Sequence, residues 1–160
     1  MKQKDRPPLS HDPSHRIGVY KHLRDVPEKY RLYNYEAEYQ NRDCWQEFMN
    51  YEYDRYGFDS EHYKKNSRTC ERYWKEHMDD VGRHHCLPSP EDVETFFGSL
   101  LHRMNRTTAY NNYWSRLEAF FDYLMWHTDH PHVYHPPMMA AIRYDTTASI
   151  WQRKMEVNHV

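Results

Sequence analysis

The chain has 160 residues, enough for one domain with a hydrophobic core of moderate size. It contains 4 glycines but 15 tyrosines, 6 phenylalanines and 5 tryptophans, and this balance favours helices over a turn-rich β-sandwich. The formal net charge of −2 argues against a protein that binds nucleic acid through an overall excess of positive charge.

Charge is segregated along the chain rather than spread evenly. Residues 60–75 carry five basic and two acidic side chains, and residues 99–116 carry three basic side chains and no acidic ones. The stretches 36–59 and 76–98 are instead acidic. Two short basic stretches therefore lie within an acidic body, and they are the first candidates for contact with an anionic partner.

The three cysteines, Cys44, Cys70 and Cys86, have no CxxC spacing. An odd number of cysteines without a secretory signal points to free thiols in a reducing compartment. The N-terminal segment lacks the apolar stretch of such a signal, and no apolar run approaches the ~18–20 residues that a membrane span requires. We therefore expect a soluble, cytoplasmic protein.

The N-terminal third divides into two segments by composition. Residues 1–27 hold four prolines, many charges and few apolar side chains, which is typical of a flexible arm. Residues 28–57 show a noisier helical pattern, with a break expected near Asn34 and a stop at Gly57. Apolar residues mark one face of this additional N-terminal helix: Trp45, Phe48, Met49 and Tyr53.

Residues 58–144 contain the clearest helical signals and are expected to form the core domain. The first helix begins at Ser60 or Ser67, ends at Gly82, and carries an amphipathic stripe with three- and four-residue spacing. The residues of the stripe are Cys70, Tyr73, Trp74, His77, Met78 and Val81.

The next helix has the strongest start signal in the chain. Ser89-Pro90-Glu91-Asp92 offers an N-cap serine, a proline at the first helical position and carboxylates in the first turn. Gly98 lies inside this helix and costs up to ~1 kcal/mol relative to alanine, unless a neighbouring helix packs closely against it. The apolar face consists of Val93, Phe96, Phe97, Leu100, Leu101 and Met104.

The following helix begins at Thr107 or Thr108 and is predicted to be central to the core. Its continuous apolar face consists of Tyr110, Tyr113, Trp114, Leu117, Phe120, Phe121, Leu124 and Met125. A shorter helix is predicted over residues 138–143, and residues 145–160 form a linker or a terminal helix. Nothing reads as a pair of strands, so the predicted fold class is all-α.

Residues 66–142 combine several motifs in a fixed order. A Thr followed by a Tyr four residues later opens one helix, P-S-P-E-D-V-x-x-F opens the next, and R-T-T-x-x-x-x-Y-W-x-x-L-x-x-F-F-D-Y-L opens a third, before a short helix led by proline. This ordered set resembles the core-binding (N-terminal, SAM-like) domain of the tyrosine recombinases, the phage-integrase and Cre-like family of DNA recombination and integration. The resemblance spans about half of the chain, and residues 36–56 match the extra N-terminal helix of Cre-like members.

The resemblance implies an orthogonal bundle of two helical hairpins, with four core helices, an additional N-terminal helix and an arm. It also implies that helices at 67–81 and 107–126 present their N-terminal parts to the major groove of double-stranded DNA near the strand-exchange site. The two basic stretches lie at or near the starts of these same helices, where free N–H groups and the positive end of the helix dipole also favour phosphates.

We therefore predict a cationic saddle that clamps duplex DNA where the leading turns of the two helices converge. Basic side chains would anchor phosphates, and hydroxyl and amide groups would add polar contacts, since Asn is able to read an adenine edge. The predicted DNA-binding residues are Lys64, Lys65, Arg68, Thr69, Arg72, Arg103, Arg106, Thr107, Thr108, Asn111, Asn112 and Ser115.

Catalysis is not expected of this chain. In the resembled family a second domain holds arginines, a His-x-x-Arg segment, a Lys and the nucleophilic Tyr, whereas no His here is followed by Arg three residues later. A nucleophilic Tyr needs cations converging on a phosphate, and no tyrosine is nominated. No cofactor and no small-molecule substrate are predicted. The chain is either the N-terminal part of a recombinase or a free-standing protein that binds recombination sites, associated with the nucleoid when bound.

An alternative function is a helical protein–protein adaptor that assembles with recombinase protomers or with itself. An apolar set near the C-terminus suits such docking, with burial against the chain's own core as the other interpretation. This set consists of Met138, Met139, Ile142 and Trp151.

Histidines concentrate in two predicted loops that the hairpin arrangement brings to one end of the domain, opposite the predicted DNA face. They are His84 and His85, beside Cys86, and His127, His130, His132 and His135. Such side chains are good zinc ligands, but their spacing matches no zinc signature. Exposed loop histidines, responsive to pH between about 5 and 7, are the preferred interpretation, and no metal is predicted.

Overall fold

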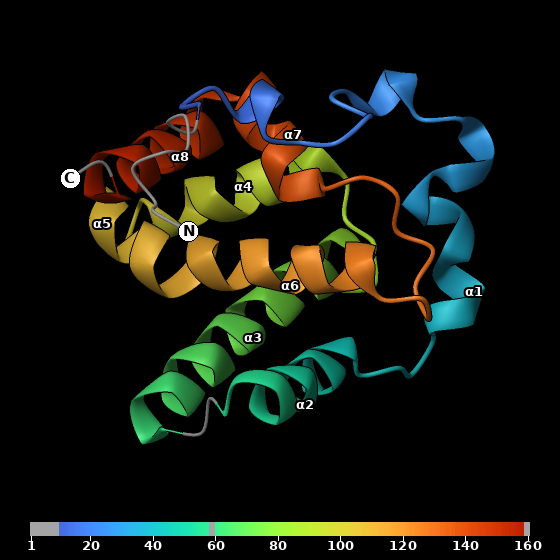
Figure 1. Ribbon diagram of the computed structural model, residues 1–160, viewed down its shortest axis with the longest axis horizontal. Coiled ribbons are helices and arrows are strands. Elements are labelled where there is room, and N and C mark those ends of the chain that lie inside the picture. The colour runs from blue at the N-terminus through green and yellow to red at the C-terminus, as the bar shows by residue number, and fades with distance from the viewer. Residues whose placement is uncertain (1–9, 58–59, 159–160) are drawn as a thin grey trace, which may run out of the picture.

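Helices provide all regular secondary structure in the computed structural model, which describes residues 10–57 and 60–158 and contains no strand within those ranges (Figure 1). The α-helices are α1 (Glu36–Tyr39), α2 (Cys44–Tyr56), α3 (Glu61–Val81), α4 (Pro90–Leu100), α5 (Arg106–Ala109), α6 (Ser115–Trp126), α7 (Pro136–Arg143) and α8 (Asp145–Asn158). Short 3-10 helices precede α1: η2 (Pro13–His15), η3 (Leu23–Asp25), η4 (Glu28–Tyr30) and η5 (Leu32–Tyr35). None of the helices in this part of the chain has both the length and the apolar character to cross a membrane. The all-α prediction is confirmed.

Local sequence signals fix the ends of α2 and α3. Asp43 caps α2 and Ser60 caps α3, each through a side-chain oxygen that accepts a backbone N–H from the first turn. Both helices end at glycines in the left-handed region, Gly57 with φ 68° and Gly82 with φ 78°. Ser67, the other predicted start of α3, lies buried inside the helix.

The predicted start of α4 is confirmed in detail. Ser89 and Asp92 form a capping box, in which each side chain accepts a hydrogen bond from the other's backbone N–H. Gly98, by contrast, has no close neighbour: a Cβ added there meets no atom within 4 Å. The close helix packing that would justify this glycine is therefore absent around Gly98.

Gly98→Ala is expected to raise the free energy of unfolding by up to about 1 kcal/mol, because alanine fits the open space and loses less backbone entropy in a helix. Urea denaturation followed by circular dichroism measures the change. Gly82→Ala is the matched control: its Cβ also meets open space, but φ is positive there, so the variant should lose about 1 kcal/mol. A destabilised Gly98→Ala protein would contradict this interpretation.

The helix predicted from Thr107 or Thr108 begins slightly earlier and is not uniform. Asn105 is its cap, because the Asn105 Oδ1 atom accepts the Thr108 N–H at 2.9 Å. Between α5 and α6 the chain forms a π-helical segment, η6 (Tyr110–Trp114), whose wider turn changes the direction in which the following side chains point. In Figure 1, α4 and the α5–α6 helix run in opposite directions.

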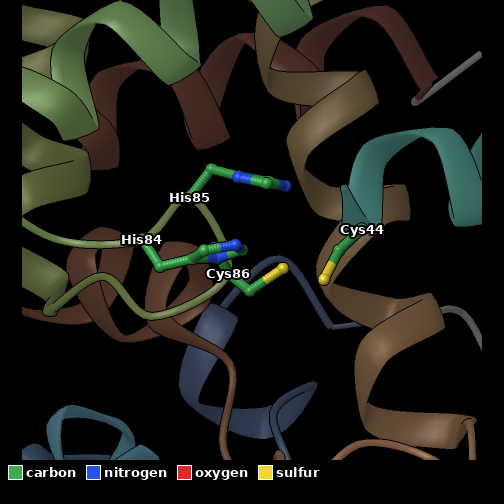
Figure 2. Close-up of side chains that lie close together, drawn as sticks. All are labelled: Cys44, His84, His85 and Cys86. Atoms are coloured by element: carbon green, nitrogen blue, oxygen red, sulfur yellow. The ribbon is translucent and has the colours of Figure 1, made fainter. Parts of the chain in front are cut away.

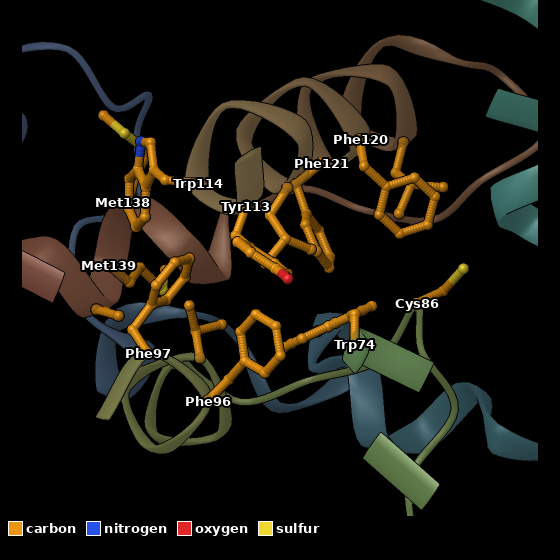
Figure 3. Close-up of a cluster of buried hydrophobic side chains, with 14 of the residues drawn as sticks. Trp74, Cys86, Phe96, Phe97, Tyr113, Trp114, Phe120, Phe121, Met138 and Met139 are labelled. Carbon is orange, nitrogen blue, oxygen red and sulfur yellow. The ribbon is translucent and has the colours of Figure 1, made fainter. Parts of the chain in front are cut away.

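Aromatic side chains fill the centre of the molecule (Figure 3). Rings of α3, α4 and η6 pack edge to face or tilted. The ring centres of Trp74 and Phe96 are 5.1 Å apart, and those of Phe97 and Trp114 are 5.5 Å apart. The indole N–H of Trp74 donates to the carbonyl oxygen of His85 at 2.9 Å, so its buried polar tip is satisfied. The aromatic residues therefore supply the core, as the composition predicts.

Residues 10–27 pack against the C-terminal helices, which corrects the predicted flexible arm over this range. η2 contacts α7, and the indole N–H of Trp151 donates to the carbonyl oxygen of His11 at 2.7 Å. The guanidinium of Arg16 lies 5.0 Å from the centre of the Trp151 ring, and Val26 is buried. Residues 1–9 of the predicted arm lie outside the described residues.

The segments before and after the core also differ from prediction. Residues 28–39 form 3-10 turns and one short helix rather than the start of a long one, and the break falls at residues 40–43, where Asn41 has φ 63°. Residues 145–158 form α8, the terminal helix among the two predicted options. The carboxylate of Glu94 accepts the backbone N–H groups of Thr146 and Thr147 at 3.0 and 2.8 Å, so α4 supplies the cap of α8.

Candidate nucleic-acid interface

One arginine from each of the two basic stretches of the sequence contacts the ring of Tyr73. Arg72 of α3 and Arg103 of the α4–α5 connection place their guanidinium carbons 4.9 and 4.7 Å from the centre of this ring. Both arginines are exposed, whereas Tyr73 is half-buried and its ring lies 6.0 Å from that of Tyr113. Cation–π contact therefore holds two positive charges together at the surface.

Two further cations, Lys64 and Lys65, occupy the N-terminal part of α3. Both are exposed, and within the residues that the structure describes neither has an ion-pair partner. Lys65, Thr69 and Arg72 follow each other at four- and three-residue spacing and so share one face of α3. The Thr69 hydroxyl donates to the carbonyl oxygen of Lys65 at 2.9 Å, which leaves its oxygen able to accept a hydrogen bond.

Arg68 and Arg106, which were also predicted to converge, are held by different neighbours. Arg68 donates to Glu71 at 2.8 Å and to Gln46 of α2 at 2.5 Å. Arg106 donates to both carboxylate oxygens of Glu156 of α8, at 3.2 and 3.1 Å. An acidic partner therefore neutralises each of these two side chains, and neither adds a free positive charge to the predicted saddle. Arg72 and Arg103 take their place.

Two other cations of the basic stretches are structural. Lys75 donates to Glu71 at 2.6 Å and to Asp43 at 3.0 Å, which joins α3 to the start of α2. Arg116 of α6 donates to the buried Glu52 of α2 at 2.9 Å. These ion pairs hold the additional N-terminal helix against the core and leave neither cation free for a phosphate.

The predicted uncharged contacts lie along α5 and η6. Asn111 is exposed, whereas the other predicted residues on these turns, Thr107, Thr108, Asn112 and Ser115, are half-buried. The Ser115 hydroxyl donates to the carbonyl oxygen of Asn111 at 2.7 Å. The amide of Asn111 is consequently the most accessible hydrogen-bonding side chain in this group.

The electrostatic character of α3 reverses along its length. Lys64 and Lys65 lie in its first two turns and Arg72 lies near its middle, whereas Glu76, Asp79 and Asp80 are exposed nearer its C-terminal end. In Figure 1 the N-terminal ends of α3 and α5 both point to the left of the view. Lys64 and Lys65 therefore lie at the end of α3 opposite to Glu76, Asp79 and Asp80.

Sequence reasoning missed the role of Tyr73, because its position in the amphipathic stripe marks it as a core residue. Only the tertiary structure shows that Arg103, thirty positions later in the chain, lies over the same ring as Arg72. The sequence carries no spacing signal for this contact.

The two histidine-rich loops meet, as predicted, but their side chains are not exposed. His132 Nε2 lies 2.7 Å from the carbonyl oxygen of Cys86, and the Tyr39 hydroxyl lies 2.6 Å from His130 Nδ1. His85, His130, His132 and His135 are all buried. The interpretation as exposed loop histidines is therefore wrong for these residues, because the N-terminal segment that carries Tyr39 covers the loops.

Comparison of the chain with family models, with curated proteins and with solved structures finds no match in any of the three.

Proposed function

We propose that this chain is a DNA-binding domain of the tyrosine recombinase core-binding type, which clamps duplex DNA near a strand-exchange site and carries no catalytic centre of its own. The observation that carries the proposal is the meeting of Arg72 and Arg103 on the ring of Tyr73. Two basic segments that lie far apart in the sequence form one exposed positive surface there, and Lys64 and Lys65 extend it along α3.

The surface suits a phosphate backbone better than a small anion. Lys64, Lys65 and Arg72 are spread over about two turns of α3, a rise of roughly 12 Å, with Arg103 beside Arg72. Consecutive phosphates along one strand are separated by several ångströms. Arginine donates in a planar fork that matches a phosphate oxygen pair. Asn111 on the neighbouring segment supplies a side chain of the type that reads a base edge.

The acidic remainder of the chain sets the expected strength of binding. With about four phosphate contacts, affinity falls steeply with salt, with a logarithmic slope near −4. Carboxylates at the opposite end of α3 are repelled by DNA, so they favour one orientation of the domain on the duplex. Weak, oriented binding fits a module that acts beside other DNA-bound domains.

Arg72→Ala and Arg103→Ala are each expected to weaken binding to duplex DNA and to reduce the logarithmic salt slope by about one, because each removes one phosphate contact. Fluorescence anisotropy with a labelled duplex at several salt concentrations measures both quantities. The double variant should lose about two units of slope.

Arg143→Ala is the matched control for Arg72→Ala. Arg143 is also exposed and also lies over the ring of the next residue, Tyr144, at 5.5 Å, but it belongs to α7, away from the proposed surface. Arg106→Ala should weaken binding less than Arg72→Ala, because Glu156 already pairs with Arg106. Equal losses in all of these variants would point to non-specific attraction and contradict the assigned face.

The alternative function, a protein–protein adaptor, has less apolar surface than predicted, because of the four predicted docking residues only Ile142 is not buried, and it is half-buried. Met138, Met139 and Trp151 are buried in the chain's own core, so they are not available to a partner. One observation still favours the alternative: Trp126 at the end of α6 is 87% exposed, and an exposed ring of this size is typical of contact surfaces. Sedimentation of the protein without DNA over a range of concentrations distinguishes the two functions.

A further inference from the structure

Two cysteines and two histidines from separate parts of the chain come together beneath the N-terminal segment. Cys44 is the first residue of α2, and His84, His85 and Cys86 lie in the connection between α3 and α4. One ligand atom from each of the four lies within 4.8 Å of all the others. Figure 2 shows the two sulfur atoms facing each other, with both imidazole rings directed toward the same space.

The burial of this cluster distinguishes it from a chance gathering on the surface. Cys44 and Cys86 are both fully buried free thiols, and His85 is 8% exposed. His85 Nε2 is a buried nitrogen with no hydrogen-bond partner among the described residues. Buried polar atoms are nearly always paired, and an unpaired buried ring nitrogen in a cluster with two free thiols indicates a missing bond to a ligand.

The hydrogen bonds of His84 prepare it to act as a ligand. His84 Nε2 lies 2.8 Å from the carbonyl oxygen of Arg42, so this nitrogen carries the proton and donates. His84 Nδ1 accepts the backbone N–H of Cys86 at 3.0 Å, so its lone pair is directed toward Cys86. A histidine that donates its other N–H to a backbone carbonyl is the usual arrangement around a metal ion.

We propose that Cys44, His84, His85 and Cys86 bind a zinc ion. Two cysteines and two histidines form a common tetrahedral ligand set for structural zinc. Two thiolates balance the charge of Zn²⁺, so the complex is neutral overall, and a neutral complex is what a buried position of low dielectric tolerates. This proposal does not depend on the DNA-binding function.

Binding requires a modest rearrangement and the release of protons. Neighbouring ligand atoms of a tetrahedral zinc site lie roughly 3.3–3.8 Å apart, so the cluster contracts by up to about 1.5 Å at its widest pair. His84 Nδ1 exchanges the Cys86 N–H for the metal. Each of the two thiols forms a sulfur–zinc bond and releases its proton to solvent, while both imidazoles bind as neutral groups.

The electrostatic surroundings favour neutral imidazoles. Burial lowers the pKa of His85 to about 3. Burial also lowers the pKa of His84, and it outweighs the opposing effects of the hydrogen bond to the Arg42 carbonyl and of the Glu36 charge. Neither ring therefore competes for a proton near neutral pH. Burial also raises the pKa of Cys86, so the metal must displace a firmly held proton and affinity should increase with pH.

The ion would join two parts of the molecule at the end opposite to Lys64 and Lys65. Cys44 belongs to the additional N-terminal helix, and the other three ligands belong to the core. A carboxylate oxygen of Glu36 also accepts the backbone N–H of His84 at 3.1 Å, which fixes the loop from the side of α1. Zinc would thus lock the N-terminal segment onto the helices that carry the proposed DNA surface.

Metal analysis of the full chain purified without a histidine tag tests the proposal. We expect about one zinc ion per chain, and replacement by Co²⁺ should produce thiolate-to-cobalt charge-transfer bands together with the intense visible bands of tetrahedral cobalt. Cys44→Ser, Cys86→Ser and His85→Gln should each reduce bound metal at least tenfold.

Cys70→Ser is the matched control, because Cys70 is also a buried free thiol but lies against the carbonyl oxygen of Tyr113, away from the cluster. This variant should keep its metal. The wild-type stoichiometry and the cobalt spectrum do not depend on whether any variant folds. Absence of both, a disulfide between Cys44 and Cys86 in their place, or an equal loss of metal in Cys70→Ser would overturn the proposal.

Discussion

Glu52→Ala is expected to lower the free energy of unfolding by about 3–5 kcal/mol, because it leaves a largely buried arginine without its counter-ion. Glu52 of α2 is 6% exposed, and its Oε1 atom accepts hydrogen bonds from Arg116 of α6 and from the hydroxyl of Tyr63 of α3. One carboxylate therefore joins three helices. Urea denaturation followed by circular dichroism measures the loss.

Two comparisons separate the unpaired charge from the loss of a surface contact. Glu28→Ala removes an ion pair with Arg31 in which the Glu28 side chain is 66% exposed. This substitution should lower the free energy of unfolding by less than about 0.5 kcal/mol. The double variant Glu52→Leu with Arg116→Leu removes both charges and should regain most of the stability. If Glu52→Ala costs no more than Glu28→Ala, the ion pair is not a significant part of the fold.

The sequence predicts those parts of the fold that depend on neighbours along the chain. Ser89 and Asp92 lie three residues apart, so the capping box of α4 needs no tertiary information. Gly57 and Gly82 end α2 and α3 for the same local reason. The apolar stripe of α3 likewise follows from helical periodicity alone.

Other elements depend on contacts that periodicity does not encode. Residues 10–27 look disordered by composition, yet Arg16 packs on Trp151 near the opposite end of the chain. The start of α8 is capped by Glu94 of α4, fifty-two positions before Thr146. Neither pairing leaves a signal at short spacing, so the sequence does not predict the packed N-terminal segment and does not decide between a linker and a helix for residues 145–158.

The candidate interface shows the same division. Helical spacing places Lys65 and Arg72 on one face of α3, but it does not say which cations are already neutralised. Glu71 lies three residues after Arg68 on the same helix, so spacing alone places it there, but only the fold reveals Gln46 beside Arg68 and Glu156 beside Arg106. The π-helical turn of η6 also changes the phase of the helix, so a regular helix projects the residues after it incorrectly.

His130 lies in a position where the folded structure disfavours its protonation. Its side chain is fully buried, and burial, reinforced by the charge of Arg42, lowers its pKa from 6.5 to about 4. Glu47 lies 3.7 Å from His130 Nε2 but already accepts two hydrogen bonds from Arg42, at 2.8 and 2.9 Å. Arg42 therefore largely neutralises the charge of Glu47. The other nearby groups, His127, Asp129 and the neutral Tyr39, do not cancel the lowering of the His130 pKa.

Acidification from pH 7 to pH 4 is therefore expected to destabilise the protein through His130 by about 3 kcal/mol. Below pH 6.5 His130 binds a proton in the unfolded chain, whereas in the folded chain it stays neutral until the pH approaches about 4. The free energy of unfolding therefore falls as the pH drops from 6.5, and this loss ends near pH 4. Urea denaturation at closely spaced pH values gives the slope of the free energy of unfolding against pH.

His130→Gln removes this titration and should reduce that slope by the uptake of one proton. His102→Gln, at an exposed position before α5, is the control and should leave the slope unchanged. A profile that is equally steep in wild type and His130→Gln would show that protonation of His130 is not the cause of acid sensitivity.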